Sequence, residues 1–252
     1  MNAHVASLWR YPVKGFTPER RDGADLPAGG YFPCDRLFAV ENGPSGFDSA
    51  APAHISKVKF TVLAALAEVA RVHTAYDETT GELAARAAGQ PSLRAKLTDP
   101  AGRAAFAAWL TAFLGSAVQG PLKVVHAPGH RFVDSRSGFV SVINLASVRD
   151  LESKVGRPID PLRFRANFYV EGWPAWSEAE ALGRTLKLGG ATLEVIKPID
   201  RCAATGVDPK TGDRDMDVVA ALFEHFRNID CGVYLRAIED GRVAEGDAAA
   251  WL

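Results

Sequence analysis

One cysteine in this chain lies where a thiol can do chemistry. Cys202 follows Arg201 directly and precedes a polar segment, Ala203–Gly212, whose Asp-Pro and Thr-Gly pairs are typical of sharp turns. A thiol held in a fixed turn beside a guanidinium is favoured in its ionised form, because the positive charge stabilises the thiolate. Thiolates act as nucleophiles and as ligands of soft metal centres. The pattern therefore predicts a functional Cys202, against the alternative of an inert buried cysteine.

The cysteine turn also carries a resemblance to a known family. Asp200–Gly212 resembles the cysteine-bearing turn of the MOSC family, the domain at the C-terminus of molybdenum cofactor sulfurases. Stand-alone amidoxime-reducing and hydroxylaminopurine-reducing proteins are similar to it too. Other segments resemble further signatures of these proteins and occur in the same order along the chain: Leu8–Lys14, Cys34–Val40, Trp109–Gly115, Asn144–Leu151, Arg163–Asn167 and Gly232–Asp247. Any one fragment is weak, but the ordered set covers nearly the whole chain.

The resemblance implies that the chain binds molybdenum cofactor, with Cys202 as the catalytic residue and the protein ligand to molybdenum. A charge-donating thiolate would help to set the potential of a metal that cycles between two oxidation states. The cofactor is a pterin with a terminal phosphate, so its site needs fixed donors and positive charge, which arginine and lysine supply. The implied contacts to phosphate or pterin are Lys14, Arg36, Ser147, Arg165, Asn167, Asp200, Arg201 and Thr205.

Some of these candidates have structural interpretations that compete with the functional one. For Lys14 and Arg36 the alternatives are an ordinary surface charge or a structural ion pair, and the resemblance favours cofactor contact. Ser147, with Asp150 three residues later, is typical of a helix N-cap, although a helix N-terminus also binds anions. Both interpretations of Ser147 remain open from the sequence.

Two further ambiguities concern the residues beside the thiol and the Arg-Phe-Arg-Ala-Asn segment. Asp200 and Thr205 flank Cys202 and either orient the thiol or the cofactor, or only cap the turn. Because alternate residues of a strand point to opposite faces, Arg163 can simply face solvent. Arg165 and Asn167 are therefore the stronger candidates in that segment.

The sequence departs from the family pattern at three places. Gly15 stands where amidoxime-reducing relatives often have serine, which removes one hydroxyl near the cofactor. Ala166 replaces a proline commonly found between the arginine and the asparagine, and the acidic-plus-tryptophan signature is only loosely matched by Trp173–Glu180. Cofactor binding is still expected despite these departures. What they put in question is the substrate and whether the protein turns it over.

The resemblance implies an oxidoreductase that reduces N-hydroxylated or N-oxide compounds by two electrons. The chain lacks the four-cysteine run of an iron–sulfur domain, so electrons are expected from a separate ferredoxin- or cytochrome-like protein. The alternative is a carrier that delivers molybdenum cofactor or sulfur, with Cys202 holding the cofactor or a persulfide in transit. A third alternative is a family member that has lost the cofactor.

Composition fits a cytoplasmic globular protein. The 252 residues carry 29 basic and 30 acidic side chains, a net charge of −1, which gives no bulk field for nucleic acid or a membrane. Cys34, Cys202 and Cys231 are an odd number without tight spacing, so we expect reduced thiols, with Cys34 and Cys231 in the core. The six histidines are scattered, and none is assigned to a metal. Neither a secretory leader nor a membrane-spanning helix is expected.

Strand signals outnumber helix signals along the chain. Helices are expected after Asp99-Pro100 up to Gly115, from Ser147 to Gly156, and over Val218–Phe226. Short strands are expected at Val5–Trp9, Leu37–Glu41, Thr74–Tyr76, Leu83–Ala85, Phe168–Glu171, Leu193–Lys197 and Gly232–Ala237. The fold class is therefore mainly β or α+β with barrel-like architecture and a few short helices. The resemblance implies a MOSC N-terminal β-barrel-like subdomain over residues 1–118 and a MOSC domain over residues 119–252.

Overall fold

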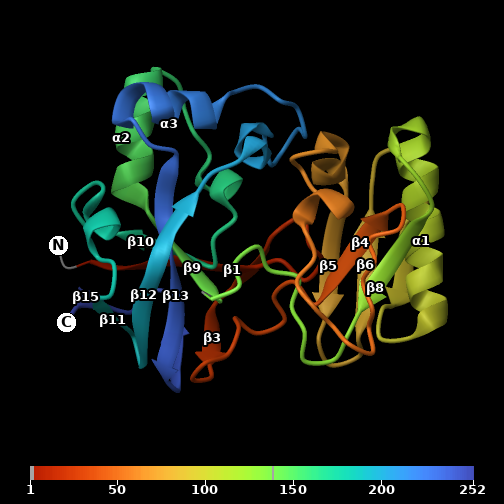
Figure 1. Ribbon diagram of the computed structural model, residues 1–252, viewed down its shortest axis with the longest axis horizontal. Coiled ribbons are helices and arrows are strands. Elements are labelled where there is room, and N and C mark those ends of the chain that lie inside the picture. The colour runs from red at the N-terminus through yellow and green to blue at the C-terminus, as the bar shows by residue number, and fades with distance from the viewer. Residues whose placement is uncertain (1–2, 138) are drawn as a thin grey trace.

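Strands dominate the computed structural model, which describes residues 3–137 and 139–252. They form one large sheet and three small ones, with three α-helices packed on the outside (Figure 1). This arrangement confirms the expected strand-rich α+β class. Within the described residues, none of the helices has the length and apolar character that a bilayer span requires.

The large sheet has eight strands and joins the two ends of the chain. In spatial order they are β15 (Ala249–Trp251), β11 (Thr185–Leu188), β12 (Ala191–Asp200), β13 (Asp230–Glu239), β9 (Val140–Asn144), β10 (Phe168–Glu171), β1 (His4–Arg10) and β2 (Glu19–Arg21). Neighbours are antiparallel except β9 and β10, which run parallel. The N-terminal strand β1 pairs with β10, so the start of the chain is hydrogen-bonded to its second half. The expected division at residues 118 and 119 stays a prediction.

The three small sheets hold all the remaining strands of the described residues. They are β3 (Gly23–Leu26) with β14 (Gly241–Ala244), β4 (Phe38–Asn42) with β8 (Leu122–His126), and β5 (His73–Asp77) with β6 (Glu82–Arg86) and β7 (Leu93–Lys96). The last two sheets lie beside the large sheet, together with helix α1 (Pro100–Leu114), on the right in Figure 1. Helices α2 (Leu145–Val155) and α3 (Val218–Phe226) lie together at one end of the large sheet.

Separate apolar cores hold these parts together. One core lies within the large sheet around Leu8, Phe168 and Leu235. A second fills the space between α1 and the small sheets, around Phe38 and Phe106. Strand β5 alternates exposed and buried residues, as expected of a strand with one face on a core. Val140 of the first core and Leu63 of the second are among the residues that line the pocket described below.

Local sequence signals predicted the bounds of helix α1. It begins after Asp99 with Pro100 at its first turn and ends at Gly115, as expected, although the Asp99 side chain makes no capping bond. On its expected apolar face Phe106, Leu110 and Leu114 are buried, while Trp109 and Phe113 are only partly buried and pack at the edge of the core.

Helix α2 begins earlier than expected. Its N-cap is Asn144, whose side-chain oxygen accepts a hydrogen bond from the amide of Ala146. Ser147 is therefore inside the first turn, and the N-cap interpretation of Ser147 is wrong. The end of the helix at Gly156, in the left-handed conformation, is as expected.

Two other residues lie in surroundings that the sequence did not indicate. Arg163 is buried in a short 3₁₀ helix, Pro161–Phe164, and pairs with Asp208 and Asp215, so the solvent-facing strand interpretation is wrong. Cys34 is half-buried outside any strand, whereas Cys231 is in the core as expected.

Candidate functional site

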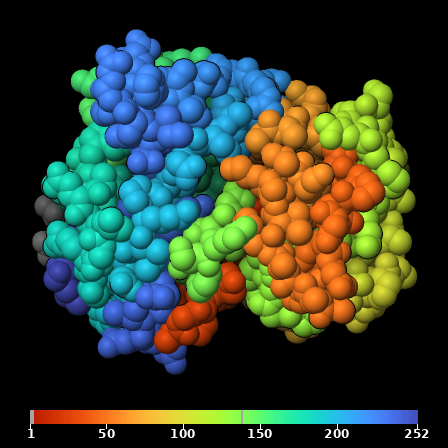
Figure 2. All heavy atoms as spheres, viewed as in Figure 1, coloured from red at the N-terminus to blue at the C-terminus, as the bar shows by residue number. Residues whose placement is uncertain are grey.

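A pocket of about 750 Å³, part of it open to solvent, lies where the small sheets meet the large one. In Figure 2 the surface is hollowed where the first half of the chain meets the second. Five cationic side chains and two carboxylates line it, which leaves a surplus of three positive charges: Lys14, Arg36, Lys57, Arg165 and Arg201 against Asp35 and Asp134.

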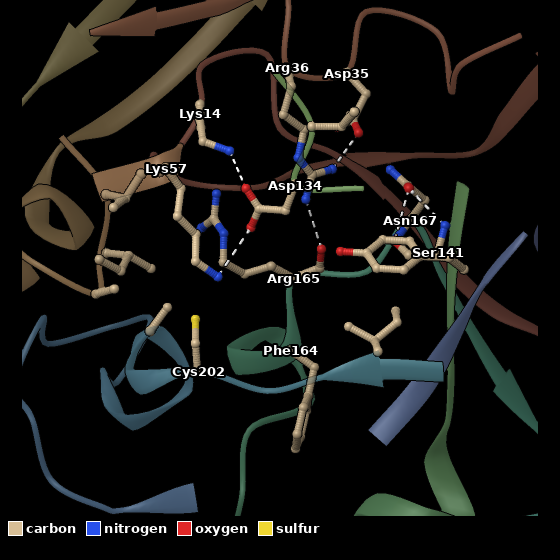
Figure 3. Close-up of a pocket in the computed structure, with 18 of the residues that line it drawn as sticks. Lys14, Asp35, Arg36, Lys57, Asp134, Ser141, Phe164, Arg165, Asn167 and Cys202 are labelled. Atoms are coloured by element: carbon tan, nitrogen blue, oxygen red, sulfur yellow. Dashed lines mark hydrogen bonds and ion pairs between the residues drawn. The ribbon is translucent and has the colours of Figure 1, made fainter. Parts of the chain in front are cut away.

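Cys202 lies in this pocket, at the end of β12. Its backbone is extended and precedes a short 3₁₀ helix, Ala203–Gly206, which starts with the amide of Thr205 donating to the Cys202 carbonyl at 3.0 Å. The side chain is half-buried and points into the pocket (Figure 3). The turn therefore presents one accessible thiol to the space between the two halves of the chain.

The cation that interacts with this thiol is Lys57. Burial works against the charged ammonium, but Asp134 and Cys202 beside it outweigh that effect and raise the pKa of Lys57. Arg201, the residue expected to play this part, donates instead to the carbonyls of Cys231 and Phe164. A positive charge beside the thiol is thus present, but it comes from the short 3₁₀ helix Lys57–Lys59, which begins 145 residues earlier in the sequence.

Asp134 joins two lysines across the mouth of the pocket. Its carboxylate contacts the Lys14 ammonium on one side and Lys57 at 3.8 Å on the other (Figure 3). Lys14 also donates to the Phe132 carbonyl at 2.9 Å. Burial tends to raise the pKa of Asp134, but the two lysines and Arg36 lower it to about 2. Asp134 is therefore a carboxylate that partly neutralises the lysine pair.

Arg36 and Arg165 form a second basic pair, built on the ring of Tyr11. Their guanidinium carbons lie 4.3 and 4.4 Å from the ring centroid. Arg36 contacts Asp35 and donates to the Arg165 carbonyl at 2.9 Å. Arg165 has no carboxylate partner of this kind in the part of the chain that the structure describes, and burial together with Arg36 lowers its pKa to about 10. Its Nη2 atom is buried and lacks a hydrogen-bond partner among the residues that the structure describes.

Both arginines have unusual backbone conformations. Arg36 has φ of 47° and Arg165 has φ of 53°, in the left-handed region that side chains other than glycine seldom adopt. Such strain persists only where the surroundings enforce it, and it concentrates at functional sites. The fold thus holds the two guanidinium groups in place at an energetic cost.

Asn167 also lies in the pocket, but its side chain is already engaged. Its oxygen accepts from the amide and hydroxyl of Ser141, at 3.1 and 3.0 Å, and its nitrogen donates to the Trp9 carbonyl. These bonds join Asn167, the residue before β10, to β9 and β1. Asn167 therefore shapes the floor of the pocket, with its amide fixed in one orientation (Figure 3).

Three expected contacts are not among the residues that line the pocket. The Ser147 hydroxyl is buried and donates to Glu178, while it accepts from the amide of Trp176. The Thr205 hydroxyl donates to the Cys202 carbonyl, which fits its alternative role as a cap of the turn. Asp200 is exposed beside the turn. The structure thus brings together Lys14, Arg36, Arg165, Asn167, Arg201 and Cys202.

Comparison with known families accounts for both halves of this arrangement. Residues 129–250 match the MOSC domain, and residues 2–119 match the MOSC N-terminal beta barrel domain. The chain belongs to the MOSC-domain family. Cys202, Arg165 and Asn167 lie within the MOSC match, and Lys14 and Arg36 lie within the N-terminal match.

Curated relatives of this MOSC protein are larger. The chain is 30% identical over 127 residues to a molybdenum cofactor sulfurase of Caenorhabditis briggsae, covering 46% of this chain and 18% of that protein. It is 31% identical over 123 residues to the molybdenum cofactor sulfurase of Caenorhabditis elegans, covering 44% and 17%. The chain thus spans less than a fifth of the length of these relatives.

Solved structures include similar chains at lower identity. The YuaD protein from Bacillus subtilis aligns with 99% of this chain and 94% of its own, with 15% identity and a TM-score of 0.48. YiiM from Geobacillus stearothermophilus aligns with 46% of this chain and 54% of its own, with 19% identity and a TM-score of 0.37.

The residues of the MOSC pocket fit the cofactor that this family is associated with. A phosphate-bearing pterin needs positive charge, and the pocket has a surplus of it. A molybdenum ligand needs an accessible thiol, and Cys202 is one. A guanidinium that binds a ligand is expected to have an unpaired donor when the ligand is absent. The Arg165 Nη2 atom is such a donor among the described residues.

Sequence reasoning missed Lys57 and Asp134 in this MOSC protein. Lys57 follows a segment rich in Gly, Pro, Ser and Ala, residues 42–56, and Asp134 has no motif around it. Tyr11 was within a quoted segment but was given no role. The available signal in the sequence was a charged residue close to a large apolar residue. Phe60, shortly after Lys57, and Phe132, shortly before Asp134, are both buried.

Replacing Gly15 is expected to destabilise the protein. Gly15 has φ of 90°, and a Cβ atom there would lie 2.4 Å from the Thr61 carbonyl oxygen. Gly15→Ala should therefore lower the free energy of unfolding by about 3 kcal/mol, measured by chemical denaturation. Gly89→Ala is the control, since Gly89 has φ of 76° but open space around it, and about 1 kcal/mol is expected. Equal losses in the two variants would show that the contact with Thr61 has no effect.

Replacing Asp134 is expected to change the acid sensitivity of the fold. The pKa of this carboxyl is lowered from 3.8 to about 2, so its pairing stabilises the fold above pH 3.8 and is lost as pH falls toward about 2. Asp134→Asn should lower the neutral-pH stability by no more than about 1 kcal/mol, because the site is partly exposed, and should flatten this acid limb. Denaturation from neutral to acid pH measures both, with exposed Asp22→Asn as control. An unchanged acid limb in Asp134→Asn would contradict the pairing.

Proposed function

We propose that this MOSC protein binds molybdenum cofactor in the pocket around Cys202 and acts as an oxidoreductase. The observation that carries the proposal is the half-buried thiol in a cationic pocket that also holds Arg165, whose Nη2 atom has no hydrogen-bond partner among the described residues. The substrates are N-hydroxylated or N-oxide compounds, and the electrons come from a separate ferredoxin- or cytochrome-like protein. When bound, the cofactor supplies two-electron oxygen-atom transfer.

The residues of this chain divide the work of holding that group. Cys202 would provide the sulfur ligand to the metal, and the Lys57 ammonium lies beside this thiol. Arg165, Arg36 and Lys14 supply donors for the phosphate, since each is held rigidly by the fold. Asn167 and Ser141 keep the pocket floor fixed, because their side chains bond to each other and to the backbone.

The competing function is that of a carrier that delivers cofactor or sulfur. It is favoured by one observation: the curated relatives that match this chain are named molybdenum cofactor sulfurases. A thiol beside a lysine suits a persulfide as well as a metal, because both need ionised sulfur.

Purification from a cofactor-producing host separates these functions. We expect close to one molybdenum and one pterin per chain, and reduction of hydroxylamines or N-oxides when a chemical reductant replaces the protein donor. Tight cofactor binding without turnover would favour the carrier. Persulfide sulfur on Cys202, found by mass spectrometry in protein that lacks molybdenum, would favour sulfur delivery. Absence of metal, pterin and persulfide would refute both functions.

A further inference from the structure

A second cavity adjoins the cofactor pocket and has a different lining. It holds about 790 Å³, part of it open to solvent, and we call it the outer cavity; its lining includes Tyr31, His54, His130, Arg131 and Arg136. Val133 lines both this cavity and the Cys202 pocket, and a narrow cavity between them is lined by Lys14 together with His54 and His130. The two spaces are therefore neighbours along one loop.

The outer cavity has cations without compensating acids. No carboxylate is among the described residues that line it. Neither Arg131 nor Arg136 forms an ion pair with a residue that the structure describes, in contrast to Lys14 and Arg36 in the pocket beside it. Guanidinium groups that are left without carboxylates at the wall of a cavity are sites for carboxylate or phosphate.

Arg131 is held in a fixed position for such a ligand. Its Nη1 atom donates to the His130 carbonyl at 2.9 Å, and its guanidinium carbon lies 5.8 Å from the centroid of the Tyr31 ring. Its Nε atom is buried and has no partner among the described residues. The His130 ring packs on Phe132, with centroids 4.9 Å apart. Arg136, by contrast, is exposed.

The two imidazoles provide neutral polar groups. Burial and the nearby Arg136 lower the pKa of His54, and burial together with Arg131 lowers the pKa of His130. Both rings are therefore neutral at neutral pH, so each offers one N–H donor without adding charge. The positive charge of the outer cavity is concentrated on its two arginines.

We propose that the outer cavity binds the anionic group of the substrate, so that the preferred substrates are N-oxygenated compounds that carry a carboxylate or a phosphate. This inference rests on the proposed function, which puts the reacting group at the neighbouring Cys202 pocket. Binding at a remote anionic group helps to position the reacting part of a substrate. Arg131 and Arg136 are then specificity-determining residues.

Binding of matched probe pairs tests this without any turnover. The pairs are isonicotinate with isonicotinamide and adenosine monophosphate with adenosine, titrated calorimetrically into protein from a cofactor-producing host. We expect roughly tenfold tighter binding of the anion in at least one pair, and its loss in Arg131→Gln/Arg136→Gln. The pair with the larger arginine-dependent preference identifies carboxylate or phosphate as the group bound. Arg86→Gln, at an exposed arginine of β6 outside these cavities, should keep the preference.

Three results would overturn the inference. They are equal binding of anion and neutral partner in the wild type, a preference that survives in the double variant, and loss of molybdenum from the double variant, which would assign these arginines to the cofactor. The single variant Arg136→Gln changes an exposed side chain and gives the same test if the double variant is unstable. The binding measurement does not depend on reductase activity. A failed reductase assay would therefore count against the proposed function alone.

Discussion

Cys202→Ala is expected to reduce molybdenum in the purified protein to background and to abolish reductase turnover. Among the described residues that line the pocket, Cys202 has the one side chain that suits a soft metal. Alanine offers no ligand atom in place of the thiol. The free energy of unfolding should change by less than about 1 kcal/mol, because Cys202 is only half-buried. Metal analysis and chemical denaturation of the same preparation measure both effects.

Cys34→Ala is the matched control for this experiment. Cys34 is also a half-buried free thiol, but it lies outside the pocket and donates to Glu78 at 3.2 Å. It should retain its full content of metal and pterin. Molybdenum retained near one per chain in Cys202→Ala would remove Cys202 from the metal, whereas loss in both variants would point to a general effect of thiol removal.

Elements with local signals were predictable from the sequence. The proline after Asp99 and the glycine at position 115 bound one helix, and a short strand-like run located β10 at Phe168–Glu171. These signals work because capping and side-chain periodicity depend on residues a few positions apart. The pairing of β1 with β10 was not predictable in this way, because no residue near β1 specifies a partner more than 150 positions later.

The candidate site shows the same division. Resemblance to the family led to Lys14, Arg36, Arg165, Asn167 and Cys202, and the fold brings these five residues to one pocket. Whether they bind a cofactor stays a prediction.

The errors at the site arose where two local interpretations competed. Asn144 and Ser147 are both good N-caps, and the sequence gave no reason to prefer the earlier one. Asp160-Pro161 signalled the start of a helical turn, which places Arg163 inside the fold instead of on a strand. Lys57 was missed because its contacts with Asp134 and the thiol depend on two loops meeting in space.

Arg165→Met is expected to have opposite effects on stability and on cofactor binding. In the cofactor-free protein it removes a desolvated cation with a buried, unpartnered donor, so the free energy of unfolding should rise by about 1 kcal/mol. Cofactor retention should fall about ten- to a hundredfold, since a charge-assisted hydrogen bond to the ligand contributes roughly 1.5–3 kcal/mol. Denaturation of cofactor-free protein and pterin content after dialysis measure the two effects.

Arg201→Met distinguishes a ligand-binding arginine from a structural one in the same pocket. The Arg201 guanidinium donates to the carbonyls of Cys231 and Phe164, so its loss leaves buried acceptors unpaired and should destabilise the cofactor-free protein by about 2 kcal/mol. A gain for Arg165→Met beside a loss for Arg201→Met means that the strained, unpaired Arg165 is maintained for a ligand. Equal losses in both variants would instead make Arg165 a part of the scaffold, because a guanidinium that stabilises the empty pocket has no need of a ligand.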